Sequence, residues 1–69
     1  MKLSARNVLK GKVKKIREGA VNSEVVVQVS GGLEIVSVIT KTSIDNLNLK
    51  EGADVYAIIK ATNVILGVD

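Results

Sequence analysis

The fold is decided by residues 21–41, which read VNSEVVVQVSGGLEIVSVITK. Two apolar segments, 21–29 and 33–41, flank the tripeptide Ser30-Gly31-Gly32. Both segments are rich in valine and isoleucine, whose branched side chains favour an extended backbone. Glycine tolerates the positive φ that a tight hairpin turn requires. The stretch therefore predicts two antiparallel strands joined by a short turn.

The second of these strands is apolar on both faces, because Leu33, Ile35 and Ile39 alternate with Val36 and Val38. A strand of this kind in a small domain is usually covered by its own core on one face and by a neighbour on the other. The chain has 69 residues and contains no Cys, Phe or Trp, so a monomer would be only marginally stable. We therefore expect oligomerisation to complete the core.

The segment before the hairpin predicts another strand, over residues 9–16. Apolar residues or glycine alternate with lysines from residue 9 to residue 14, and this period of two leaves one face of the strand in water. The alternation slips at Lys15-Ile16. A β-bulge, or the end of the strand, would return Ile16 to the apolar side.

The segment after the hairpin predicts a short helix and two further strands. Thr42 or Ser43 can cap a helical turn over residues 44–49. Alternating apolar residues then predict a strand over 55–60 and a short last strand over 64–66.

Together these elements make one domain, residues 1–69, of the all-β class. We expect a small five-stranded OB-like barrel with one short helical turn, completed by oligomerisation, because closing the sheet removes most exposed edges.

The composition argues against an enzyme. The chain has no His and no Cys, and its seven acidic residues are scattered along the sequence. General acid–base catalysis, nucleophilic catalysis and metal-assisted hydrolysis each need a particular group of side chains, and this sequence contains none of these groups. The sequence therefore predicts no catalytic residues, no metal ligands and no cofactor.

The basic segment 10–17 leaves a nucleic-acid-binding barrel open as an alternative function. It holds five of the ten basic residues of a chain with a net charge of +3, which suggests an anionic partner. Single-strand binding by small barrels depends on aromatic platforms, and Tyr56 is the one aromatic residue. Contact with phosphates alone stays possible, as does a purely structural assembly module without a ligand.

No apolar run approaches the length of about 20 residues that crosses a bilayer, and the start of the chain lacks the apolar core of a signal peptide. We therefore expect a cytoplasmic protein with no membrane partner.

Donors suited to a small oxyanion occur at three places. Ser4 and Arg6 supply a hydroxyl and a guanidinium, which presents a fixed fork of N–H groups. Residues 40–43 are a polar cluster at a predicted junction between strand and helix, and residues 60–62 follow the fourth strand. Each also has a simpler interpretation, as a polar chain start, a helix cap or a surface charge.

Four segments together resemble the Mop domain of the molbindins. They are SARN at 4–7, LKGKV at 9–13, SVIT at 37–40 with Ser43, and VYAIIKATNV at 55–64. The resemblance covers nearly the whole chain with a single repeat. It is specific because the opening and closing motifs occur in the family's order and separation.

The resemblance implies a free-standing cytoplasmic protein that binds molybdate, and often tungstate, and that assembles as a hexamer of OB-like barrels. Such a protein would store or buffer the oxyanion, and nucleic acid would not be its partner. The binding residues would come from two subunits, with Ala61 contributing only its backbone N–H where some family members have Ser. One subunit would provide Ser4, Arg6, Lys60 and Ala61, and its neighbour would provide Thr40 and Ser43.

Overall fold

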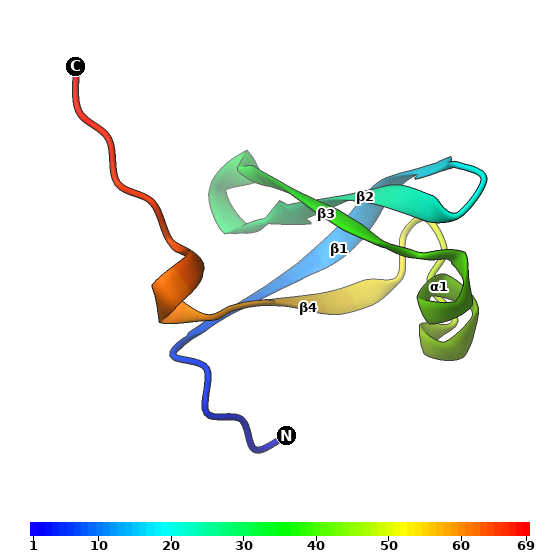
Figure 1. Cartoon of the computed structure of the whole chain (residues 1–69), viewed down its shortest axis with the longest axis horizontal. Helices are drawn as coiled ribbons and strands as arrows, with labels where there is room; N and C mark the ends of the chain where they lie inside the picture. The colour runs from blue at the N-terminus through cyan, green and yellow to red at the C-terminus, as the bar shows by residue number, and fades with distance from the viewer.

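The structure, a computed structural model of residues 1–69, is a four-stranded antiparallel sheet with one short helix (Figure 1). The strand order is β3-β2-β1-β4, and the sheet curls into a half-barrel, consistent with an OB-like fold. Two turns of 3-10 helix, η1 at Ser30–Gly32 and η2 at Ala61–Asn63, complete the chain. The main elements are β1 (Asn7–Glu18), β2 (Asn22–Val29), β3 (Glu34–Thr40), α1 (Lys41–Leu47) and β4 (Asp54–Ile59).

The hairpin that the sequence predicts is confirmed as β2 and β3. The two strands pair antiparallel, with Val26 opposite Val36. Gly31 and Gly32 adopt φ values of 83° and 81°, in the left-handed region where a side chain would be strained. The backbone N–H of Val29 closes the turn by donating to the carbonyl of Leu33 at 2.8 Å.

The first strand is longer than predicted and carries the expected bulge. β1 pairs with β4 through its first half and with β2 through its second half. Val13 lies opposite Val27, while Lys15 lies opposite Val26, so Lys14 is the extra residue. The bulge resets the alternation, and Ile16 returns to the packed face beside the core.

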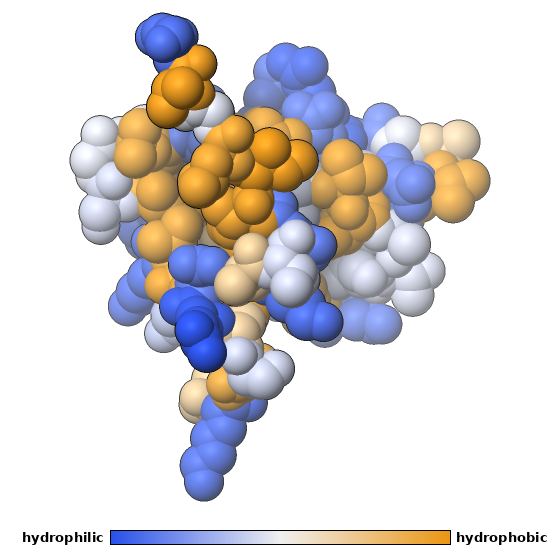
Figure 2. All heavy atoms as spheres, turned by 60° about the vertical axis from the view of Figure 1, so that its left-hand side comes forward, coloured by the Kyte–Doolittle hydropathy of each residue, from blue (hydrophilic) through white to orange (hydrophobic).

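The core is small. Only five of the 69 residues are buried, and the four apolar ones are Val13, Val25, Val27 and Ile44, the last from α1. On β3, Val36 and Val38 remain 58% and 65% exposed. The single chain therefore leaves a large share of its aliphatic side chains in water, and Figure 2 shows apolar side chains over much of one face.

The helix begins earlier than the sequence predicted. α1 covers Lys41–Leu47, not 44–49, and its N-cap is Thr40, not Thr42 or Ser43. The side chain of Thr40 accepts a hydrogen bond from the backbone N–H of Ser43, which is the usual capping geometry. Asn48 ends the helix with a φ of 52°, so the following residue, Leu49, can pack against the core instead of extending the helix.

The predicted fifth strand was wrong for the single chain. Residues 64–66 belong to no strand, and the C-terminal segment projects away from the sheet in Figure 1. The sequence pattern of a strand is present there, but a strand also needs a partner for its backbone N–H and C=O groups. No segment of the same chain lies beside residues 64–66 to provide one.

Candidate functional site

The opening motif is held against the end of β4. Asn7, the first residue of β1, pairs with Ile59, the last residue of β4. Its side-chain Nδ2 also donates to the carbonyl of Ile59 at 3.2 Å. The residues on either side of this pair, Arg6 and Lys60, therefore occupy adjoining backbone positions. Both are exposed, and neither has a carboxylate partner.

The chain turns sharply directly after Lys60. The backbone N–H of Asn63 donates to the carbonyl of Lys60 at 2.8 Å, and that of Val64 donates to the carbonyl of Ala61 at 3.3 Å. The first N–H groups of such a turn have no partner inside it. The N–H of Ala61 is one of these groups, so it can donate to a ligand beside Lys60.

The polar pair at the start of α1 is joined by two hydrogen bonds. The Thr40 hydroxyl donates to Ser43 Oγ at 2.9 Å and accepts from the Ser43 backbone N–H at 3.0 Å. The single proton of the Thr40 hydroxyl is thereby used. The Ser43 hydroxyl acts as an acceptor in this pair, so its own proton remains available to a ligand. Thr40 is exposed and Ser43 is partly buried.

A single chain does not bring these two donor groups together. Asn7 and Ile59 mark one end of β1. Thr40 pairs with Asn22 at the opposite end, beside the β1–β2 turn. β1 is 12 residues long, and the donor groups lie at its two ends. Arg6, Lys60 and Ala61, with Ser4 two residues before Arg6 in the chain, therefore belong to a first donor cluster at one end of β1, and Thr40 and Ser43 belong to a second cluster at the other end of the sheet.

Ion pairs neutralise part of the basic segment. Lys12 Nζ lies 2.9 Å from Asp54 Oδ1, and Lys14 pairs with Glu34. The hydrogen bond and the charge of Lys12 lower the pKa of Asp54 below its ordinary value. Because two of its lysines are engaged in this way, the segment offers fewer free charges to a nucleic-acid backbone than its composition suggests. Tyr56, the one aromatic residue, is half exposed on β4.

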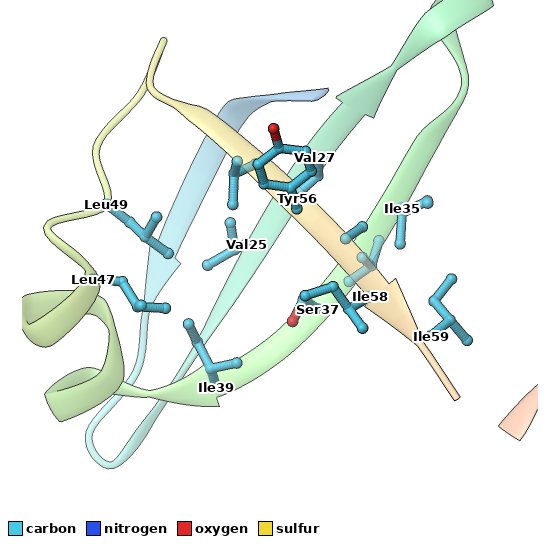
Figure 3. Close-up of a pocket in the computed structure, with 13 residues that line it drawn as sticks. Val25, Val27, Ile35, Ser37, Ile39, Leu47, Leu49, Tyr56, Ile58 and Ile59 are labelled. Atoms are coloured by element: carbon cyan, nitrogen blue, oxygen red, sulfur yellow. The ribbon is translucent and has the colours of Figure 1, made fainter. Parts of the chain in front are cut away.

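A groove of about 340 Å³ opens between β3 and β4, the two edges of the sheet (Figure 3). Twelve of its 13 lining residues are hydrophobic, and Ser37 is the exception. Such a surface offers almost no donors to an oxyanion. The groove is therefore distinct from both donor clusters.

Asn7 is the residue whose role the sequence reasoning missed. It was part of the opening motif but was not assigned to the site, because its sequence position does not show which carbonyl its amide meets. A polar side chain at the first position of an otherwise apolar or basic strand was the available signal. The structure also shows no cluster of three or more potential metal-ligating side chains, and no helix that is long and apolar enough to span a bilayer.

The sequence is similar to proteins of one kind along almost its entire length. The TOBE domain model matches residues 3–66. A probable molybdenum-pterin-binding protein of Haemophilus influenzae is 48% identical over the whole of both chains. A Clostridium pasteurianum molybdenum-pterin-binding protein is 46% identical over 96% of this chain and 97% of its own length.

The fold is similar to solved structures of the same kind. Ligand-free MopII from Clostridium pasteurianum superposes with a TM-score of 0.92 at 43% identity, over 97% of this chain and all of that one. The cytoplasmic molybdate-binding protein ModG, with molybdate bound, superposes with a TM-score of 0.96 at 55% identity, over all of this chain and 49% of that one. The chain therefore belongs to the TOBE domain family and forms a single domain of the Mop type.

Proposed function

We propose that this protein binds molybdate, and also tungstate, at sites formed between two copies of the chain. The observation that carries the proposal is the similarity to ModG, whose structure contains molybdate and matches this chain at 55% identity over its full length. The protein would act in the cytoplasm as a store and buffer of the oxyanion. Binding would be reversible and would involve no bond making, so no catalytic residue is required.

The first donor cluster supplies positive charge to the site. A tetrahedral dianion taken out of water needs compensating charge and a full set of donors. Arg6 and Lys60 occupy adjoining backbone positions and have no carboxylate partner, so both charges are free for the anion. Ser4 would add its hydroxyl, and Ala61 would add the backbone N–H at the start of η2.

The second cluster would come from another copy. Thr40 and Ser43 lie at the end of β1 that is remote from Arg6 and Lys60, so a single chain cannot close the shell. In the proposed arrangement the Ser43 hydroxyl donates to the anion while the Thr40 hydroxyl orients it. The site thus forms only in a homo-oligomer, which we propose to be a hexamer.

The exposed aliphatic side chains support assembly. Val36, Val38, Ile58 and Tyr56 are all at least 43% exposed. Contiguous exposed apolar surface usually marks an interaction site in a small protein. Covering this surface would also supply the stability that a core of four apolar residues lacks.

Calorimetric titration with molybdate, tungstate and sulfate, with the oligomer mass measured in parallel, tests the proposal. We expect submicromolar binding of the first two anions by a hexamer and much weaker binding of sulfate. Tungstate should also bind, because it and molybdate are tetrahedral dianions of nearly the same size that present four acceptor oxygens. Absence of heat with molybdate would overturn the proposed function, and tight binding by a monomer would overturn the shared site.

A further inference from the structure

The outer face of the β1–β4 pair leads along the two strands to the first donor cluster. The strands lie side by side, and Arg6 and Lys60 adjoin the end of the pair (Figure 1). Side chains on a strand alternate between the two faces of a sheet, and Val55 packs against the core on the inner face. In order from the cluster, the cross-strand pairs on the outer face are Val8 with Ile58, Lys10 with Tyr56, and Lys12 with Asp54.

Lys10 is the unpaired lysine among these three pairs. Lys12 Nζ lies 2.9 Å from Asp54 Oδ1, whereas Lys10 makes no ion pair and is exposed. The pKa of Asp54 is lowered chiefly by the hydrogen bond from Lys12, and the charge of Lys10 contributes least. Positive charge is therefore cancelled at the pair far from the donor cluster and remains free at the pair nearer to it.

The spacing along β1 lets the charge of Lys10 act at the donor cluster across an apolar gap. Four residues of strand, about 14 Å, separate Lys10 from Arg6. Val8 and Ile58 occupy the outer face between them. Neither strand has an acidic residue between the Lys10–Tyr56 pair and the cluster, so no carboxylate there opposes the field of Lys10. At this range a positive charge attracts a dianion without binding it.

We propose that Lys10 is a steering residue, which speeds the arrival of the oxyanion at Arg6 and Lys60 without contacting the anion once it is bound. This role presupposes the anion site proposed above. A free positive charge beside a site raises the local concentration of an anionic ligand and therefore raises the association rate. The Lys12–Asp54 ion pair assists, because it cancels a charge that would attract the anion to a position further from the site.

Coulomb's law determines the size of the effect and its dependence on salt. One positive charge about 14 Å from a dianion in water should change the association rate about twofold at an ionic strength of about 0.01 M, where the screening length is about 30 Å. At about 1 M salt the screening length is about 3 Å, and the effect should vanish. A residue that contacts the bound anion would also change the dissociation rate.

Rapid-mixing experiments with isotopically labelled molybdate and the assembled protein test the role of Lys10. At an ionic strength of about 0.01 M, Lys10→Gln should bind about twofold more slowly than the parent, and Lys10→Glu about fourfold more slowly. Lys10→Arg, which keeps the charge, should bind at the parental rate. The parent and all of these variants should release molybdate at the same rate and should associate with it equally fast at about 1 M salt.

Lys12→Gln combined with Asp54→Asn is the matched control, because it removes both charges of an ion pair from the same face and leaves the net charge unchanged. This variant should associate at the parental rate. A parental rate for Lys10→Glu at low salt would overturn the proposal. Faster release from Lys10→Gln would also overturn it, because Lys10 would then contact the bound anion. If the parent does not bind molybdate, the proposed function itself is wrong and Lys10 has no anion to steer.

Discussion

The side-chain amide of Asn7 donates a hydrogen bond of 3.2 Å to the backbone carbonyl of Ile59. The same two residues form the outermost pair of the β1–β4 ladder. The amide therefore fixes the point at which the N-terminal and C-terminal motifs meet. It holds Arg6 and Lys60 at adjoining positions, although 54 positions separate them in the sequence.

Asn7→Ala should weaken molybdate binding without removing a donor to the anion. A typical intramolecular hydrogen bond contributes about 0.5–1.5 kcal/mol, so we expect a loss of up to about tenfold in affinity, measured by calorimetry. Gln28→Ala, an exposed amide side chain on β2 whose strand neighbours are Lys12 and Glu34, is the matched control and should bind normally. Equal losses in both variants would show that Asn7 does not position the site.

Arg6→Ala and Lys60→Ala should each reduce molybdate affinity severely. Removing one member of a buried charge pair typically costs about 2–5 kcal/mol, because the anion would remain desolvated and only partly compensated. Titration of each variant at constant ionic strength measures the loss. Lys15→Ala, in the basic segment remote from the site, should lose little. Full affinity in both Arg6→Ala and Lys60→Ala would refute the proposed site.

Thr40→Ala should destabilise the start of α1. The Thr40 hydroxyl accepts from the Ser43 backbone N–H, and loss of such a cap costs about 1 kcal/mol. Thermal unfolding should show a lower midpoint for Thr40→Ala and near recovery for Thr40→Ser, which keeps the hydroxyl. Thr42→Ala is the control, because Thr42 lies within the helix and does not cap it. If Thr42→Ala lowered the unfolding midpoint more than Thr40→Ala, Thr42 would be the helix cap, as the sequence alone suggested.

Gly11→Ala should disrupt the centre of the sheet. A Cβ at Gly11 would lie 2.4 Å from the carbonyl oxygen of Gln28 and 3.0 Å from Val27 Cγ1. Overpacking of this kind costs about 1–3 kcal/mol, and here the closest atom belongs to the backbone, which cannot easily move. Denaturant unfolding of Gly11→Ala should show this loss of stability as a lower free energy of unfolding. Gly67→Ala, whose Cβ would meet nothing within 4 Å, should leave the free energy of unfolding of the single chain unchanged.

The ion pair of Lys12 and Asp54 should add a small pH dependence to the free energy of unfolding. The hydrogen bond and charge of Lys12 lower the pKa of Asp54 below its ordinary value of 3.8. The folded protein therefore releases this proton more readily than the unfolded chain. The pair stabilises the fold above about pH 3.8, and this contribution disappears as the pH falls through the lowered pKa.

Asp54→Asn should therefore unfold at a lower temperature than the parent at neutral pH, and the two unfolding midpoints should converge in acid. Because both side chains are mostly exposed, added salt should also reduce the difference. A difference that persists at low pH would assign the effect to something other than the carboxylate charge.

The local elements could be predicted from the sequence because local chemistry specifies them. Gly31 and Gly32 permit the turn, alternation gives the strands, and the slip in that alternation before Ile16 reveals the bulge. The sequence placed the helix cap two or three residues too late, because the hydroxyls of Thr40, Thr42 and Ser43 can each accept a hydrogen bond from a backbone N–H. Which of the three caps the helix depends on where β3 ends, and the sequence pattern does not fix that point.

The fifth strand and the complete site could not be predicted in the same way. Residues 64–66 have the composition of a strand, but strand formation depends on a partner that the pattern does not identify. The six candidate donors were named by resemblance to a family. Their division into two clusters follows from the pairing of Asn7 with Ile59 and of Asn22 with Thr40, which is long-range information.

The bulge at Lys14 has a consequence for how the gene can vary. Deleting that one codon would remove the bulge, and residues 15–18 would keep their partners on β2 with Ile16 still facing the core. Deleting the codon of Lys15 as well would place Ile16 directly after Val13 and turn it toward water. Insertions and deletions in surface loops are commonly inherited without harm, and the bulge gives β1 one position at which a single residue can be lost without exchanging the two faces of the strand.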